Sequence, residues 1–344
     1  MQTPVAAHAP HALPQPYLLF LGDTTEPGYA KTAFGLRDWA PERCVGEYAC
    51  GATVSTGLPW LTPAQAQARG ARAMVIGVAN PGGRIPGHWL PALHEALGAG
   101  LDLIGGMHVR LAGIATLREA AQAHGRQLID VREPPAGLPV ASGKKRSGKR
   151  LLTIGTDCAL GKKYTALALS RAFAARGVDV DFRASGQTGI LIAGGGIPMD
   201  AVVADFAAGA AELLSPEADP AHWDVIEGQG SLSHPAFAGV SLALLHGSQP
   251  DVIVACHQHG REHVLGHPDY PLPSLEDTIA LALLHARRTN PAARCAGVSL
   301  NTAGLDPAAA AQAIADSSAR LGLPVADPVR GGEAFARLVD ACLQ

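Results

Sequence analysis

The chain has 344 residues, of which 47% are hydrophobic and 17% charged, and its net charge is −3. This length exceeds the size at which a single hydrophobic core stops growing, so we expect two folded domains rather than a disordered chain. The balance of charges disfavours nucleic acid and anionic membranes as partners, and no apolar run is long enough to span a membrane. The six cysteines contain no C-x-x-C pair, which disfavours a disulfide framework and indicates a reducing, cytoplasmic location.

The first 16 residues are rich in Ala, Pro and His and lack the pattern of a signal peptide, so we interpret them as a flexible tail. Strand-like apolar runs then alternate with helix-like stretches, which predicts a small parallel-sheet domain over residues 17–140. The predicted strands are Tyr17–Leu21, Ala73–Val78, Asp102–Ile104 and Gln127–Val131, and the predicted helices include Pro63–Arg69 and Leu90–Ala99. Open α/β sheets bind ligands in the turns that follow their strands, and such turns make Asn80, Arg84 and His108 candidates for substrate binding.

Residues 141–150, with the sequence ASGKKRSGKR, read as a linker between the two domains. Charge runs of this kind are usually solvated, although the Lys and Arg residues would also suit a phosphate.

The same alternation of strands and helices resumes over residues 151–344 and predicts a second, doubly wound α/β domain. Its predicted strands are Leu151–Ile154, Val178–Arg183, Asp224–Ile226, Val252–Cys256 and Cys295–Leu300. Its predicted helices include Lys162–Arg176, Asp200–Leu213, Leu275–Arg287 and Pro307–Leu321.

A glycine-bounded loop carries the strongest functional signal. The strand Leu151–Ile154 leads into this loop, and a lysine and a helix follow, which is the context of a P-loop. Backbone N–H groups of such a loop converge on bound phosphate, and Lys162 adds a positive charge. The predicted phosphate-binding residues are Gly155, Thr156, Asp157, Cys158, Ala159, Leu160, Gly161, Lys162 and Lys163. In one respect the loop departs from the P-loop pattern, because Lys163 stands where a Ser or Thr normally binds Mg²⁺, which argues against metal-assisted nucleotide hydrolysis.

Gly155-Thr156-Asp157 with Gly161-Lys162, and later Ile226-Glu227-Gly228-Gln229-Gly230, resemble motifs of dethiobiotin synthetase. That resemblance implies that Glu227 helps to hold Mg²⁺, or serves as a general base if no metal is present. It also implies that Asn301 lies beside a nucleotide base.

A second resemblance covers nearly the whole chain. Its motifs are Gly77–Gly83, Gly100–Asp102, the phosphate loop, Glu227–Gly230 and Asp327-Pro328, and they are similar to a bacterial family of D-glutamate N-acyltransferases that was long of unknown function. The resemblance implies a Rossmann-like N-terminal domain, a P-loop C-terminal domain, and transfer of an acyl group from acyl-coenzyme A, such as acetyl-CoA, to the amine of D-glutamate. Lys163 suits this reaction because the phosphates of coenzyme A are held but not cleaved. We further expect small-molecule partners and a homo-oligomer.

Three residues are candidates for the base that deprotonates the substrate amine. Glu227 and His234 lie in the loop after a strand beside the predicted phosphate site, and His257 directly follows the strand Val252–Cys256. Arg183 is a candidate carboxylate clamp, because its planar fork binds a carboxylate with two hydrogen bonds; a peripheral salt bridge is the alternative. Cys158 could form a covalent acyl-cysteine, but we favour the alternative that it is simply a small residue that fits the loop.

His259 and His263 are four residues apart, as metal ligands often are. Nearby Gly260, Gly266 and Pro268 predict a loop here, and no carboxylate completes a metal motif, so we predict no metal site.

Two further functions stay open. One is an ATP-dependent ligase or kinase of the dethiobiotin synthetase type, in which Glu227 and Asp157 position Mg²⁺. The other is a nucleotide-sensing P-loop regulator. An NAD-dependent enzyme is disfavoured, since no G-x-G-x-x-G motif follows an early strand.

Overall fold

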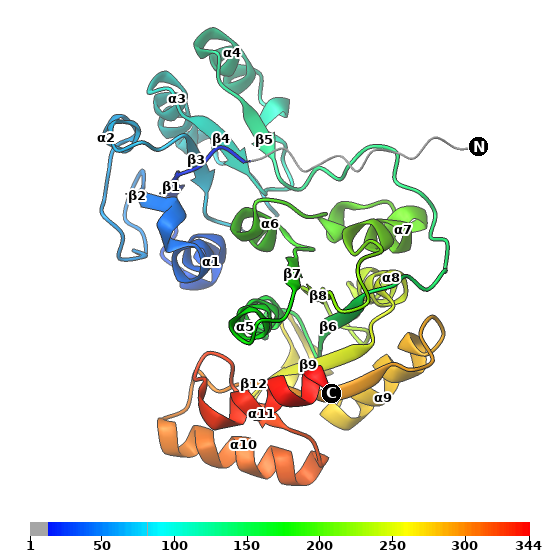
Figure 1. Cartoon of the computed structure of the whole chain (residues 1–344). Coiled ribbons are helices and arrows are strands. Elements are labelled where there is room, and N and C mark those ends of the chain that lie inside the picture. Colours follow the sequence, from blue (N-terminus) through cyan, green and yellow to red (C-terminus); the bar gives the residue numbers. More distant parts are fainter. Residues whose placement is uncertain (1–12, 81) are drawn as a thin grey trace, which may run out of the picture. The chain divides into compact units, whose positions relative to one another are not determined.

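The computed structural model describes residues 13–80 and 82–344, and the chain forms two compact units (Figure 1). The first unit contains the residues up to Pro134 together with Gln187–Pro198, and the second contains Pro135–Gly186 together with Met199–Gln344. Each unit is built on its own parallel sheet, so the predicted two-domain α/β fold is confirmed.

The sheet of the first unit has five parallel strands in the order β2-β1-β3-β4-β5. Four of them match predicted runs, whereas β2 was not predicted, because Gly46 and Glu47 interrupt its apolar pattern. The strands are β1 (Tyr17–Phe20), β2 (Cys44–Tyr48), β3 (Ala73–Ile76), β4 (Asp102–Gly105) and β5 (Leu128–Asp130).

Helices of the first unit begin and end at local sequence signals. Thr62 and Gln65 form a capping box at the start of α2, with Pro63 in its first turn, and Gly125 ends α4 in the left-handed conformation. The α-helices are α1 (Lys31–Trp39), α2 (Pro63–Ala68), α3 (Leu90–Gly98) and α4 (Ala115–His124), and the short 3₁₀ turns are Pro27–Ala30, Pro41–Arg43, Gly87–Trp89 and Leu111–Gly113. The buried side chains of α3 and α4 join strand residues such as Phe20 and Met74 in one core.

Helix α6 (Gln187–Ala193) belongs to the first unit, although it lies between two strands of the second unit in sequence. It packs against α1, where the hydroxyls of Thr32 and Thr188 lie 2.9 Å apart. Arg43 also donates a hydrogen bond of 2.7 Å to the carbonyl of Ile192. Sequence periodicity placed this segment in the C-terminal domain, because periodicity reports neighbours along the chain and not the partner against which a helix packs.

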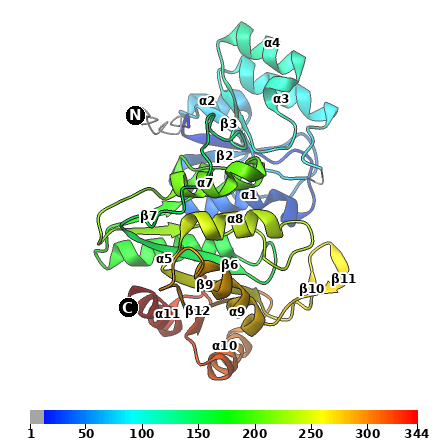
Figure 2. The same cartoon turned by 90° about the vertical axis from the view of Figure 1, so that its right-hand side faces the viewer.

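The sheet of the second unit has six parallel strands in the order β13-β12-β9-β6-β8-β7. These strands are β6 (Lys149–Gly155), β7 (Val180–Arg183), β8 (Trp223–Ile226), β9 (Val252–Gln258), β12 (Arg294–Asn301) and β13 (Val325–Ala326). A separate antiparallel hairpin of β10 (His263–Val264) and β11 (His267–Pro271) stands apart from the sheet (Figure 2). The loop predicted around His263 is therefore wrong in part, since Gly266 serves as the turn of this hairpin.

Helices cover both faces of the six-stranded sheet. On one face α5 and α11 pack against the strands, and on the other face α8 and α9 do so, with α7 packed on α8. The helices are α5 (Lys162–Ala175), α7 (Ala204–Leu214), α8 (Ala238–Ser248), α9 (Leu275–Ala286), α10 (Pro307–Leu321) and α11 (Gly332–Leu343), with a 3₁₀ turn at Met199–Ala201. Asp306 caps α10 with two hydrogen bonds, and Gly322 ends it.

Among the described residues, no helix combines the length and the apolar character that crossing a bilayer requires.

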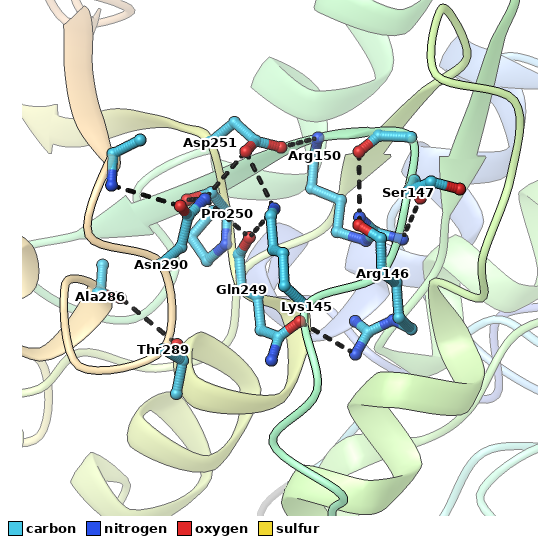
Figure 3. A network of polar contacts seen from close by, with 12 residues as sticks. Lys145, Arg146, Ser147, Arg150, Gln249, Pro250, Asp251, Ala286, Thr289 and Asn290 are labelled. Atoms are coloured by element: carbon cyan, nitrogen blue, oxygen red, sulfur yellow. Dashed lines mark hydrogen bonds and ion pairs between the residues drawn. The ribbon is translucent and has the colours of Figure 1, made fainter.

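The basic segment 141–150 is bound into the second unit rather than solvated along its length (Figure 3). Arg150 is 1% exposed, and its guanidinium donates to the Ser215 hydroxyl and to four backbone carbonyls. Arg146 donates to the carbonyls of Ser215 and Gly247, and burial lowers its pKa to about 10. Lys145 pairs with Asp251 at 2.9 Å. The expectation of solvated charges is therefore wrong for Arg146 and Arg150.

Candidate functional site

The predicted phosphate loop lies at the carboxyl end of β6, near the centre of the second sheet. The neighbours of β6 are β8 on one side and β9 on the other. Glu227 directly follows β8, and His257 is the last but one residue of β9. The topology therefore brings both residues to the edge of the sheet where the loop lies.

The loop has the backbone conformation that its glycines predict. Ala159 and Gly161 have φ values of 52° and 111°, in the left-handed region that glycine adopts readily. Lys162 is 6% exposed, and its ammonium donates a hydrogen bond of 2.6 Å to the carbonyl of Asp157. Burial lowers the pKa of Lys162. An arriving phosphate would offer this ammonium a charged acceptor in place of a neutral carbonyl.

Gly228 lets the chain after β8 pass directly over β6. A Cβ atom at this position would lie 1.7 Å from the carbonyl oxygen of Thr153 and 3.1 Å from Cδ of Lys162. The Gly228 N–H also donates to the Thr153 hydroxyl at 2.9 Å. A side chain at Gly228 would therefore displace the loop lysine or the strand beneath it.

The aliphatic hydroxyl in the first turn of helix α5 is already bound to protein groups. Thr165 is 2% exposed, donates to the carbonyl of Gly161 and lies 2.7 Å from the Ser299 hydroxyl. Lys163 lies two residues before Thr165, and its ammonium is 5.3 Å from the ring centroid of Tyr164.

Asp157 is fully buried within the loop and accepts hydrogen bonds on both carboxylate oxygens. Oδ1 accepts from the Cys158 N–H at 2.6 Å, and Oδ2 accepts from the Leu265 N–H at 2.8 Å and from the Arg261 guanidinium at 3.1 Å. Arg261 also donates to the carbonyl of Cys158. These contacts bind the β10–β11 hairpin to the phosphate loop.

His234 is 3% exposed and faces Asp157, with Nε2 3.8 Å from Oδ1. Its Nδ1 accepts from the backbone N–H groups of Ala236 and Phe237 at 3.0 and 3.3 Å. In the neutral imidazole the proton is therefore on Nε2. Burial lowers the pKa of His234, which favours this neutral form.

His257 is half-buried, and its Nδ1 lies 2.9 Å from the hydroxyl of Thr156. Burial is the main cause that lowers the pKa of His257, and the nearby charge of Arg261 adds to it. Its imidazole is thus neutral at pH 7. Among the described residues, Nε2 has no hydrogen-bond partner, in contrast to the basic nitrogen of His234.

Glu227 is 6% exposed, and its carboxylate accepts from the N–H groups of Ser185 and Gly186, both at 3.1 Å. The Ser185 hydroxyl donates to the Glu227 carbonyl at 2.6 Å. Burial raises the pKa of Glu227, and the charge of Lys163 is the strongest of the effects that oppose this rise.

Two further predicted residues of this unit have protein partners. Asn301 lies at the end of β12, where its side-chain oxygen accepts from the Ala303 N–H at 3.0 Å. Arg183 pairs with Asp224 at 2.6 Å and with Asp181 at 2.9 Å. The guanidinium of Arg183 thus points back along the sheet to protein carboxylates, and we exclude it from the site.

The predicted substrate-binding residues of the first unit lie in the loops after β3 and β4. The Asn80 side chain accepts a hydrogen bond from the Arg84 N–H and donates one to the Arg84 carbonyl, so it stabilises its own loop. Gly83 lies against His108, because a Cβ atom at Gly83 would be 2.2 Å from the imidazole. Nδ1 of His108 lies 2.8 Å from the guanidinium of Arg132. The structure therefore brings Arg132, which sequence analysis missed, to His108 and the Arg84 loop.

Two groups of side chains have the spacing of metal ligands among the described residues. Asp157, Cys158 and His234 form one at the phosphate loop. Asp181, His222 and Asp224 form the other, at the amino end of β7 and β8. In the second group, burial opposes protonation of His222, but hydrogen bonds to Asp179 and Asp224 outweigh it and raise its pKa.

Sequence analysis also missed Arg261 as a site residue. It lies in the motif Cys256–His263, where the histidines attracted attention, and its contact with Asp157 spans 104 residues of sequence. No local pattern reveals a contact of that separation.

Comparison with known proteins gives matches over both units. Residues 42–134 match DUF1611_N, described as a Rossmann-like domain of unknown function, and residues 139–339 match DUF1611, described as a P-loop domain of unknown function. A relative from Tritonibacter scottomollicae named D-glutamate N-acetyltransferase is 49% identical over 329 residues, which cover 95% of this chain and 98% of the relative. A second protein of that name, from Pseudoalteromonas sp., is 48% identical, and the match covers 92% of this chain and 96% of that protein.

A solved structure also matches nearly the whole chain. It is the crystal structure of a DUF1611 family protein from Anabaena variabilis, with a TM-score of 0.87 and 36% sequence identity. The match covers 96% of this chain and 99% of that one.

Proposed function

Because this chain belongs to the DUF1611 family, we propose that it is an acyltransferase that moves an acetyl or other short acyl group from acyl-coenzyme A to the amine of D-glutamate. The observation that carries the proposal is the identity of 49% and 48% to two proteins named D-glutamate N-acetyltransferase, over nearly the full length of each. We further propose that this reaction serves D-amino-acid catabolism.

The phosphate loop supplies the site for the acyl donor. Backbone N–H groups between Gly155 and Lys162 and the Lys162 ammonium suit the diphosphate of coenzyme A, which is bound and not cleaved. Asn301 lies at the same edge of the sheet, two strands from β6, and we propose that it contacts the nucleotide part of the donor.

We assign the general base to His257. The amine of D-glutamate is protonated at neutral pH, and it attacks the thioester carbon only after losing that proton. Nδ1 of His257 contacts the Thr156 hydroxyl, and we propose that Nδ1 donates its proton to that hydroxyl, which leaves the lone pair of Nε2 for the substrate. The Nδ1 atom of His234 is instead occupied by two backbone N–H groups, and Oε2 of the Glu227 carboxylate accepts from two others, which stabilise its charged form.

Loss of the amine proton lets the nitrogen form its bond to the thioester carbon, and a tetrahedral oxyanion results. Backbone N–H groups of a glycine-rich turn stabilise such an anion without reorganisation. The C–S bond then breaks, and coenzyme A leaves as the thiol after taking up a proton. In the first unit, Arg84 and His108 are suited to bind the substrate carboxylates.

The test is mass spectrometry of products after the purified protein is incubated with D-glutamate and acetyl-CoA without ATP, with L-glutamate in parallel. We expect N-acetyl-D-glutamate and free coenzyme A. If product forms only when MgATP is added, the acyltransferase assignment is wrong and a ligase replaces it.

A further inference from the structure

P-loop proteins commonly hold Mg²⁺ next to the bound phosphates, with a hydroxyl directly after the loop lysine and a carboxylate on a neighbouring strand. Whether this chain can do the same depends on its oxygen donors near the loop. Each of the candidate donors is either replaced or bound to another protein group.

The hydroxyl is missing from its usual position. Lys163 stands there, and an ammonium repels a divalent cation instead of binding it. The next aliphatic hydroxyl on α5 is that of Thr165, which is buried and paired with Gly161 and Ser299.

The carboxylates near the loop are already stabilised by protein donors. Asp157 accepts from Arg261 and from two backbone N–H groups, so a cation already neutralises its charge. Glu227 accepts from the N–H groups of Ser185 and Gly186, both through Oε2. A metal would have to displace the donors of Asp157, or bind Glu227 beside the N–H groups that already stabilise its charge, in a site with little exposure to water.

The nearby group Asp157, Cys158 and His234 also fits a metal poorly, despite its spacing. A histidine binds a metal through the lone pair of a ring nitrogen. In His234 the lone pair of Nδ1 is turned to two backbone N–H groups, so Nε2, the atom that faces Asp157, carries the proton.

We propose that this P-loop binds the diphosphate of its ligand without a divalent cation, and that the Lys163 ammonium supplies the counter-charge that Mg²⁺ supplies elsewhere. Lys162 and Lys163 together provide two positive charges beside the loop, which match the charge of a diphosphate bridge in coenzyme A. The inference rests on the proposed function only for the identity of the ligand, since the metal-free diphosphate site is a property of the loop.

The experiment measures the dissociation constant of coenzyme A for the full-length protein by calorimetry, once with excess EDTA and once with MgCl₂. We expect the two values to agree within about threefold. Loss of the charge in Lys163→Ser, which restores the usual hydroxyl, should weaken binding in EDTA by about 10- to 100-fold. Lys163→Arg keeps the charge and should bind within a few fold of the unchanged protein. Lys144→Ser, in an exposed lysine, is the matched control and should have no effect.

Binding that strengthens more than about tenfold with MgCl₂, or a Lys163→Ser variant that binds normally in EDTA, overturns the inference. Inorganic pyrophosphate serves as a second probe, and the same expectations apply to it. If pyrophosphate binds without metal while coenzyme A does not bind at all, the proposed function fails and the inference stands. Melting curves of each variant distinguish loss of binding from loss of folding.

Discussion

Two imidazoles at the phosphate loop illustrate how a hydrogen bond sets the role of a side chain. His257 contacts the Thr156 hydroxyl through Nδ1, whereas Nδ1 of His234 accepts from two backbone N–H groups. Both are neutral at pH 7 because burial lowers their pKa values. Only at His257 can Nδ1 carry the ring proton and leave Nε2 as a basic nitrogen for a substrate.

We expect His257→Gln to lower kcat by about 10²- to 10⁴-fold, the usual contribution of a general base. Because the pKa of His257 lies below its ordinary value of 6.5, kcat/KM of the unchanged protein, which reports the free enzyme, should rise with pH through a midpoint below 6.5 and then level off. Activity assays across this pH range should show no such rise for His257→Gln. Thr156→Ser should keep it, and Thr156→Val should shift it; an unchanged profile in His257→Gln would assign the base to another residue.

At the scale of elements, the segment before β6 shows how sequence composition can mislead. Arg146 donates to the backbone carbonyls of Ser215 and Gly247, at the ends of α7 and α8, and Lys145 donates to the carbonyl of Gln249. Arg150 alone makes five side-chain hydrogen bonds while it is 1% exposed. The segment therefore acts as a structural part of the sheet's amino end.

Arg150→Lys should destabilise the protein by about 2–4 kcal/mol, because lysine keeps the charge but lacks the planar fork that reaches several acceptors. Urea unfolding measures this difference. The exposed Lys144→Ala is the control, for which we expect a change within about 0.5 kcal/mol. Equal effects of the two substitutions would mean that the buried network contributes little.

His222 makes the stability of the amino end of β7 and β8 depend on pH. The pKa of His222 is raised in the folded protein, so the stabilising contribution of His222 is complete below the unfolded pKa of about 6.5. This contribution is lost as the pH rises through the folded pKa. We expect His222→Gln to lower the free energy of unfolding by about 1–2 kcal/mol at pH 6 and by less at pH 8.5. Denaturant titrations at the two pH values test this. A cost that grows with pH would contradict the assigned direction.

At the scale of the whole molecule, the division into two units is not the division of the sequence into two halves. Helix α6 completes the first unit from a position after β7. Its residues Ile190, Leu191 and Ile192 are buried, and its hydroxyl contact joins Thr188 to Thr32.

Ile190→Ala should therefore cost about 2–5 kcal/mol, as buried isoleucines do. Hydrogen exchange should locate the effect in the first unit, with faster exchange in α1 and unchanged exchange in β6. Leu213→Ala is a suitable control, because that side chain is 49% exposed. Faster exchange confined to α5 and β6 would show that α6 stabilises the second unit instead.

The sequence predicted the features that depend on local pattern. The phosphate loop was predicted because a strand, glycines, a lysine and a helix are contiguous, and Glu227 and His257 because both follow predicted strands. The role of Arg261, the burial of Arg150 and the packing of α6 depend on partners tens of residues away or more, and periodicity carries no information about those. The β10–β11 hairpin was missed for a related reason, since β10 has only two residues and the turn of the hairpin is bound to the distant Asp157.

Helix α6 also bears on how the chain folds during its synthesis. A first unit that ended at Pro134 would be complete before the second began to emerge from the ribosome. Here roughly 60 further residues must be translated before α6 is made, which takes about 3–12 s at ~5–20 residues per second. During that interval the face of α1 that α6 covers is exposed on the nascent chain, and chaperones that recognise apolar surface have their best opportunity to bind there.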